Sequence, residues 1–147
     1  MDRERIRVLA VEDDPSLAFV LEEALQHAAA AEIDAVMVST LKETRERLQA
    51  ENGFELVLLD LSLPDSDGIE TFSSVRRMAP RMPVVVLTGS DDPELEQRIR
   101  ELGAAEFLLK GAIGSKTLIA KIRQVARGEH GGEDGLGEPS FPRARTG

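Results

Sequence analysis

Five polar side chains stand at the ends of short apolar segments in this sequence. Glu12 and Asp13 follow "IRVLAV", Asp60 ends "ELVLLD", Thr88 ends "PVVVLT" and Lys110 ends "EFLLK". Carboxylates held a few ångströms apart repel one another unless a cation lies near them. Oxygen ligands without His or Cys favour Mg²⁺ or Mn²⁺ over zinc. A hydroxyl and an ammonium beside such a cation could hold a dianionic phosphoryl group attached to one of the carboxylates.

This chemistry needs elements that bring the five side chains together, and the hydrophobic pattern predicts them. Short apolar, β-rich runs predict strands over Ile6–Val11, Ile33–Val38, Glu55–Asp60, Pro83–Thr88 and Glu106–Lys110. Helical spacing predicts helices over Pro15–Ala30, Leu41–Glu51, Gly68–Met78, Pro93–Leu102 and Lys116–Arg127. Thr40 and Glu43 have the spacing of a capping box, and Gly53 and Gly103 stand where helices should stop.

The strict alternation of strands and helices indicates the fold class. It predicts an α/β, doubly wound, flavodoxin-like (βα)5 domain with a parallel sheet in the order 2-1-3-4-5. In such sheets, ligands bind beyond the carboxyl ends of the strands, where the strand order reverses. The first and third strands flank that point and both end in acid, so Glu12, Asp13 and Asp60 should meet there. The acids also speak against flavin phosphate binding, because "EDDPS" would repel a phosphate.

Composition limits the function further. The 147 residues suit one domain, with a net charge of -9 and no cysteine, which excludes disulfides, thiolate metal sites and Cys nucleophiles. The negative charge favours protein or cation partners over direct binding to nucleic acid or membrane. With no export signal or long apolar segment, a soluble cytoplasmic protein is expected. We expect the domain to span 1–127, followed by a flexible tail or linker rich in Gly, Pro and charge over 128–147.

Four motifs together resemble the receiver domains of two-component response regulators. "VLAVEDDP", "LVLLDLSLPDSDG", "VVVLTGS" and "FLLK" occur in that family's order and at its usual separations, over roughly Arg5 to Arg127. The resemblance implies that Asp60 is the phosphoacceptor and that Asp13 binds Mg²⁺ directly, with Glu12 reaching the metal through water and Ser62 offering its backbone carbonyl. It also implies that Thr88 and Lys110 bind phosphoryl oxygens.

The family's activity would then be a phosphorylation switch. A histidine kinase, a histidine phosphotransfer protein or a small phosphodonor would supply the phosphoryl group to Asp60. Thr88 would turn inward, and Phe107, at the family's aromatic switch position, would fill the space it leaves. A target protein, or a second copy in a homodimer formed on phosphorylation, would read the face made by the fourth helix, fifth strand and fifth helix. The sequence departs from the family in Gly111, where proline is usual, and in Phe107, which lacks the hydroxyl of the commoner tyrosine.

Other polar residues have simpler interpretations. Asp14 could touch the metal or cap the helix that begins at Pro15. Asp65 and Asp67 are expected to shape the turn into the third helix, with Asp67 as its cap. His27 and His130 have no neighbouring catalytic pattern and are expected in packing or surface roles.

Two other classes of function remain open. A haloacid-dehalogenase-type phosphatase also phosphorylates an aspartate after an apolar strand, but it needs a second Asp two residues later as general acid, and Ser62 stands there. A pseudo-receiver would keep the fold as a docking surface only; loss of Asp60, Asp13 or Lys110 would favour it, and all three are present. The sequence thus favours a signalling phosphoacceptor that catalyses only its own phosphorylation and slow dephosphorylation, rather than an enzyme.

Overall fold

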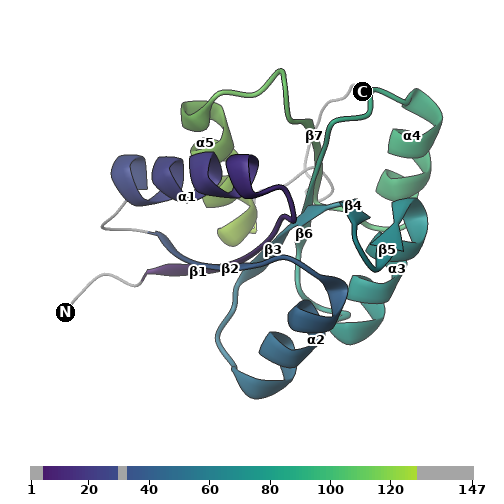
Figure 1. Cartoon of the computed structure of the whole chain (residues 1–147), viewed down its shortest axis with the longest axis horizontal. Helices are drawn as coiled ribbons and strands as arrows, with labels where there is room; N and C mark the ends of the chain where they lie inside the picture. The colour runs from purple at the N-terminus through teal and green to yellow at the C-terminus, as the bar shows by residue number, and fades with distance from the viewer. Residues whose placement is uncertain (1–4, 30–32, 129–147) are drawn as a thin grey trace.

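The computed structural model describes residues 5–29 and 33–128 (Figure 1). Its strands and helices, in chain order, are β1 (Ile6–Val11), α1 (Pro15–Ala29), β2 (Ile33–Val38), α2 (Leu41–Ala50), β3 (Leu56–Asp60), β4 (Ser62–Leu63), β5 (Ser66–Asp67), α3 (Gly68–Met78), β6 (Val84–Thr88), α4 (Pro93–Glu101), β7 (Glu106–Leu109) and α5 (Ser115–Ala126). Each predicted helix and long strand is present, and its ends lie within a residue of the predicted ones. The expected tail over 128–147 lies outside the described residues apart from Gly128.

Within the described residues, five strands form one sheet in the order β2-β1-β3-β6-β7, and all four neighbouring pairs are parallel. Counted along the chain without the two-residue strands, this is the predicted order 2-1-3-4-5. The short strands β4 and β5 form a separate antiparallel hairpin between β3 and α3 that the sequence did not predict. Two-residue strands are too short for an alternating pattern to identify them.

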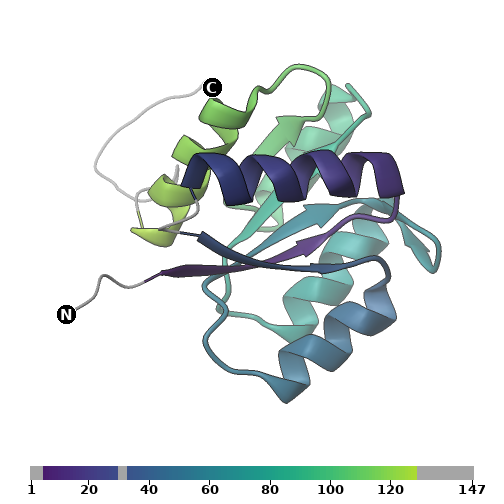
Figure 2. The same ribbon diagram turned by 60° about the vertical axis from the view of Figure 1, so that its left-hand side comes forward.

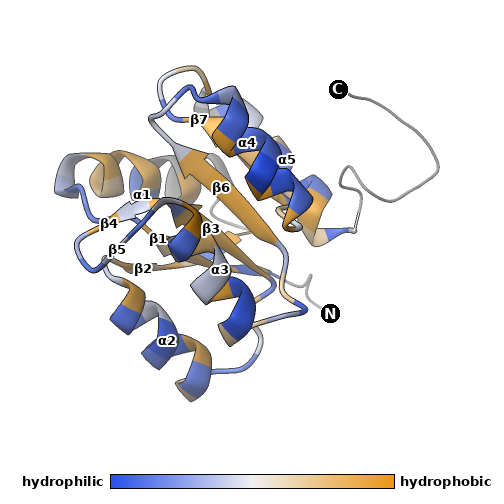
Figure 3. Ribbon diagram, turned by 90° about the vertical axis from the view of Figure 1, so that its right-hand side faces the viewer, coloured by the Kyte–Doolittle hydropathy of each residue, from blue (hydrophilic) through white to orange (hydrophobic). Residues whose placement is uncertain are grey.

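Helices cover both faces of the sheet, as Figures 1 and 2 show. On one face, α1 and α5 pack over side chains such as Val8, Leu58 and Val85. On the other face, α2, α3 and α4 pack over a second core that contains Leu9, Leu59 and Phe72. The central strands are therefore apolar on both sides (Figure 3), which explains why they read as continuous hydrophobic runs.

Local signals fix the helix ends. The Thr40 hydroxyl accepts a hydrogen bond from the Glu43 amide at 3.0 Å, as a capping box requires, while the Glu43 carboxylate accepts from the amide of Ser39 at 2.7 Å. Gly103 follows Leu102, the C-cap residue of α4, and has a φ of 109°, a conformation that residues with a side chain rarely adopt. Among the described residues, no helix combines the length and the apolar character needed to cross a membrane.

Candidate functional site

The carboxyl ends of β1, β3, β6 and β7 bring the candidate residues to one edge of the sheet. Val11 pairs with Leu59, Asp60 with Leu87, and Thr88 with Leu109. Because neighbouring parallel strands end side by side, the residues that follow each strand end are neighbours too. The structure thus brings together the five side chains from which the sequence analysis started.

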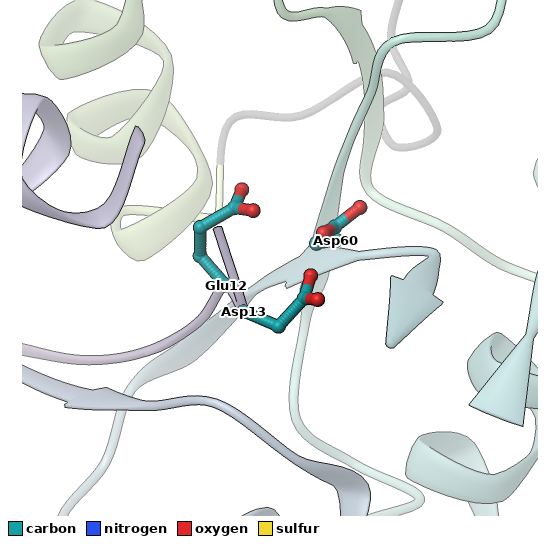
Figure 4. Close-up of side chains that lie close together, drawn as sticks. All are labelled: Glu12, Asp13 and Asp60. Atoms are coloured by element: carbon teal, nitrogen blue, oxygen red, sulfur yellow. The ribbon is translucent and has the colours of Figure 1, made fainter. Parts of the chain in front are cut away.

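Three carboxylates lie around one space at this edge (Figure 4). Glu12, Asp13 and Asp60 each offer an oxygen, and these oxygens lie within 4.8 Å of one another. Glu12 and Asp60 are each only 4% exposed, whereas Asp13 is exposed. The Asp14 amide donates to Glu12 Oε2 at 3.2 Å and the Ser62 amide donates to Asp60 Oδ1 at 3.1 Å, so backbone groups orient both buried carboxylates.

Lys110 supplies positive charge to this cluster. Its Nζ lies 2.9 Å from Glu12 Oε1 and 3.3 Å from Asp60 Oδ2, and its side chain is 17% exposed. Burial alone would lower the pKa of Lys110, but the hydrogen bond to Glu12 and the charges of Asp60 and Glu12 outweigh it and raise the pKa above 10.5. The ammonium therefore stays charged across the physiological range.

Burial raises the pKa of Asp60 from 3.8 to about 6. The amide of Ser62 and the charge of Lys110 act in the opposite direction, and the charge of Glu12 acts with burial. A carboxylate with this pKa is ionised at neutral pH, but its ionisation destabilises the folded protein, mainly because the group is buried and further because Glu12 lies nearby.

The donor set suits a small divalent cation. Three carboxylates meet with one ammonium, and among the residues the structure describes no imidazole or thiolate takes part in the cluster. Oxygen donors of this kind match Mg²⁺ or Mn²⁺, and a divalent charge would relieve the repulsion between Glu12 and Asp60.

Thr88 ends β6 at the same edge of the sheet, and Phe107 lies in the neighbouring β7, opposite Val86. Thr88 is 4% exposed, and its hydroxyl accepts a hydrogen bond from the Ser90 amide at 3.2 Å. Phe107 is 6% exposed and belongs to the core on the side of α4, together with Ile99. The ring at the expected switch position is therefore already buried in this structure.

The neighbouring acids have structural partners, and Asp67 and Asp65 differ from the predictions made for them. Asp14 Oδ1 accepts from the amides of Ser16 and Leu17, so the capping interpretation of Asp14 is confirmed. Asp67 occupies the N-cap position of α3 but makes no side-chain cap hydrogen bond; it accepts a long bond of 3.4 Å from the Ser62 hydroxyl instead.

Asp65 also differs from the prediction, because it does not shape the turn into α3 with its carboxylate. Its two oxygens accept hydrogen bonds from the amides of Leu41 and Lys42, at the beginning of α2. Nothing in the local sequence around Asp65 signals this contact, since its partners lie more than twenty residues earlier in the chain. His27 lies in α1 and His130 lies outside the described residues.

Comparisons with known proteins agree with this geometry. Residues 8–123 match the family described as "Response regulator receiver domain". The chain is 32% identical over 122 residues to the swarming motility regulation protein RssB of Serratia marcescens, covering 83% of this chain and 53% of that protein. It is 30% identical over 126 residues to the cell cycle transcriptional regulator CtrA of Caulobacter vibrioides, covering 86% of this chain and 52% of the relative. The chain thus spans about half the length of these relatives.

Solved structures show the same likeness. The non-phosphorylated HemR receiver domain from Leptospira biflexa is 30% identical, with a TM-score of 0.69 over 93% of this chain and all of that domain. A CheY-like receiver domain from Methanospirillum hungatei has a TM-score of 0.72 at 24% identity, over 85% of this chain and 96% of the other. The family match covers most of the chain and the fold agrees with it, so this chain belongs to the response regulator receiver domains of two-component signalling systems.

Proposed function

We propose that this receiver domain is a phosphorylation switch in which Asp60 accepts a phosphoryl group from a phosphohistidine of a histidine kinase or histidine phosphotransfer protein, or from a small phosphodonor. The observation that carries the proposal is the position of Asp60. Its carboxylate is buried at the end of β3, oriented by the Ser62 amide and next to Lys110 and two further acids.

Each residue of the site would have its own role in the phosphoryl transfer. An Asp60 oxygen forms the new bond to phosphorus, the bond between phosphorus and the donor nitrogen breaks, and the imidazole leaves with that electron pair. The Lys110 ammonium, 3.3 Å from Asp60, and the Thr88 hydroxyl would bind the equatorial oxygens. Mg²⁺, held by Glu12, Asp13, Asp60 and the backbone carbonyl of Ser62, would neutralise charge on the carboxylates and on the transferred group.

The acyl phosphate would change the site through Thr88. A hydroxyl that now accepts from the Ser90 amide would turn to donate to a phosphoryl oxygen. Phe107 is already buried, so its inward position needs no terminal hydroxyl and would be held by packing, with the phosphoryl group stabilising that state. The consequence would be read on α4, β7 and α5, where a target protein or a second copy of the chain would bind.

That face carries charges suited to a protein partner. Arg100 pairs with Glu96 on α4 at 2.9 Å, and Lys121 on α5 lies 3.7 Å from Glu106 on β7. The Arg100–Glu96 pair is exposed enough to contribute little to stability, and both pairs could exchange partners in an interface. We propose that the domain spans 1–127, that 128–147 is a linker or tail, and that the protein acts in the cytoplasm without contacting nucleic acid or membrane itself.

The alternatives have weaker support. A phosphatase of the haloacid dehalogenase type lacks its general acid here, since the exposed Ser62 follows two residues after Asp60. The absence of that acid favours a persistent acyl phosphate and a signalling role over turnover. Burial raises the pKa of Asp60, so keeping this carboxylate ionised lowers the stability of the fold. A pseudo-receiver, which would use the fold only as a docking surface, gains nothing from that cost.

The test is the intact mass of the protein after incubation with acetyl phosphate and Mg²⁺. The native chain should gain one phosphoryl group, and EDTA should prevent the gain. Asp60→Asn should abolish it, whereas Asp34→Asn, an aspartate at the opposite end of the sheet, should not. A native chain that gains no mass, even with histidine kinases as donors, would remove the phosphoacceptor proposal and favour the pseudo-receiver.

A further inference from the structure

Asp65, in the loop after β3, forms hydrogen bonds with the beginning of α2, which the sequence around Asp65 does not predict. Its Oδ1 accepts from the Leu41 amide at 2.9 Å and its Oδ2 accepts from the Lys42 amide at 3.1 Å. These are the first two amides of α2, and the third, that of Glu43, donates to the Thr40 hydroxyl. The beginning of α2 is therefore capped by one residue of its own turn and by one residue of the loop after the phosphoacceptor strand.

The contact is electrostatically favourable. The first amides of a helix point outward without partners within the helix and attract negative charge. Hydrogen bonds from Leu41 and then Lys42 lower the pKa of Asp65, although burial acts against them, and the charge of Arg45 acts in the same direction as the bonds. Asp65 is thus ionised and held at neutral pH even though its side chain is exposed.

Leu61 and Leu63 anchor the loop between Asp60 and Asp65 in the core, and the hydrogen bonds of its backbone carbonyl at Leu61 run to the α3 side. The Leu61 carbonyl accepts from the Gly68 amide at 2.9 Å and from the Thr71 hydroxyl at 3.0 Å. The β4–β5 hairpin packs beside α3 (Figure 3), and Leu63 in it is 8% exposed. Asp65 adds an attachment on the other side, to α2.

We infer that Asp65 is a positioning residue for the phosphorylation site: by tying the loop after Asp60 to the beginning of α2, it holds the Ser62 backbone where it orients the Asp60 carboxylate and where its carbonyl can face a divalent cation. This inference rests on the proposed function, because that function gives the Ser62 carbonyl its role. Ser62 lies between the two fixed points of the loop, with its amide 3.1 Å from Asp60 and its side chain exposed. Without the tether, the hairpin could move away from α2, and the backbone at Ser62 would move with it.

A simpler reading is that Asp65 only caps α2, and Thr40 provides the control for it. Thr40→Val removes a cap of the same helix but leaves the loop attached, and Asp65→Ala removes the tether. Each variant removes one cap of the same helix, so the two variants should lower the melting temperature to a similar extent. Asp67→Asn serves as a charge control, because it removes a carboxylate from the same loop and keeps an acceptor for the Ser62 hydroxyl.

The experiment has two readouts that need no phosphodonor. In the metal-free full chain, amide hydrogen exchange followed by NMR should become faster at Ser62 in Asp65→Ala and stay unchanged there in Thr40→Val. In a calorimetric titration, the Mg²⁺ dissociation constant should rise about tenfold in Asp65→Ala, the lower end of the range for groups that hold a metal ligand in place. Thr40→Val and Asp67→Asn should bind Mg²⁺ as the native chain does, and Asp65→Asn, which keeps one acceptor, should recover part of the affinity.

Outcomes that overturn the inference are distinct from failure of the proposed function. Unchanged exchange at Ser62 in Asp65→Ala, or equal changes in Asp65→Ala and Thr40→Val, would reduce Asp65 to a helix cap. Equal weakening of Mg²⁺ binding in Asp65→Ala and Asp67→Asn would assign the effect to charge alone. A native chain that binds Mg²⁺ but accepts no phosphoryl group would remove the proposed function, while the exchange result would still decide whether Asp65 positions the loop.

Discussion

Replacing Asp60 with Asn should stabilise the metal-free protein, although it removes the residue on which the proposed function depends. The pKa of Asp60 is raised from 3.8 to about 6, mainly by burial and further by the charge of Glu12. A rise of this size means that ionising Asp60 costs the folded state about 3 kcal/mol more than it costs the unfolded chain. Asn imitates the neutral acid and can still accept from the Ser62 amide, so we expect a gain of roughly 1–3 kcal/mol at pH 7.5.

The stability difference between Asp60→Asn and the native chain should grow as the pH rises. Because the folded pKa lies above the unfolded one, the native chain has no penalty from Asp60 below pH 3.8, where the group is protonated in both states. The penalty grows between pH 3.8 and about 6 and is complete above that. The difference in unfolding free energy between Asp60→Asn and the native chain should therefore be close to zero near pH 3.5 and largest above pH 7 (both pH values approximate).

Urea denaturation followed by far-UV circular dichroism measures this difference, since the sequence has no Trp or Tyr to report by fluorescence. Asp34→Asn, at the opposite end of the sheet, is the control and should show no such gain. Adding Mg²⁺ should raise the stability of the native chain more than that of Asp60→Asn, because the cation compensates the carboxylate that the variant lacks. An Asp60→Asn variant that is no more stable than the native chain at pH 7.5 would show that the ionised carboxylate carries no penalty.

Three further substitutions test other parts of the structure by the same denaturation measurement. Lys110→Met should lower the free energy of unfolding by about 3 kcal/mol at pH 7.5, because it leaves the buried carboxylates of Glu12 and Asp60 without their cation. An equal loss at about pH 4, where carboxylates become protonated, would contradict this cause. Arg7→Lys should lower the free energy of unfolding by about 1 kcal/mol. The guanidinium lies 4.5 Å from the centre of the Phe54 ring, and a lysine would not reproduce that contact together with the ion pairs to Asp34 and Glu51. An Arg7→Lys variant as stable as the native chain would argue against a stacked role. Gly103→Ala should cost about 1 kcal/mol or more at its φ of 109°, whereas Gly111→Ala, with open space around it, should be nearly neutral.

Much of the fold and of the site could be predicted because the signals are local. Each buried strand reads as an apolar run, and a polar residue at its end marks the sheet edge where ligands bind. Asp60 and Thr88 were placed by this logic, and the register of β3, β6 and β7 brings their strand ends together. The cap at Thr40 could be predicted for the same reason, since Glu43, whose amide donates to it, lies only three residues later.

Contacts that join distant segments could not be read in this way. The tie between Asp65 and α2 depends on how two neighbouring βα units are placed, and the sequence of the loop alone favoured a local turn. The ion pairs of Arg7 could not be predicted for the same reason, since Asp34 lies in β2 and Glu51 lies at the end of α2. The expected role of Lys110 near a phosphoryl group stays a prediction, and its ion pair with Glu12 at 2.9 Å was not foreseen, because it depends on how β1 and β7 are placed.

The penalty at Asp60 and the tether at Asp65 have a common consequence for how such a site could respond. A buried carboxylate that is unfavourable in the metal-free protein gives a cation or a phosphoryl group a larger stabilising effect when it binds, because binding removes an existing repulsion. In the proposed switch, that gain would reach the rest of the domain only if the loop next to Asp60 is fixed, since a mobile loop would relax around the new charge. Hydrogen bonds attach this loop to α2 through Asp65 and to α3 through Thr71. In the switch proposed above, the electrostatic cost at Asp60 and the attachment of its loop would thus act together, and removing either should weaken the proposed coupling between Asp60 and the α4–β7–α5 face.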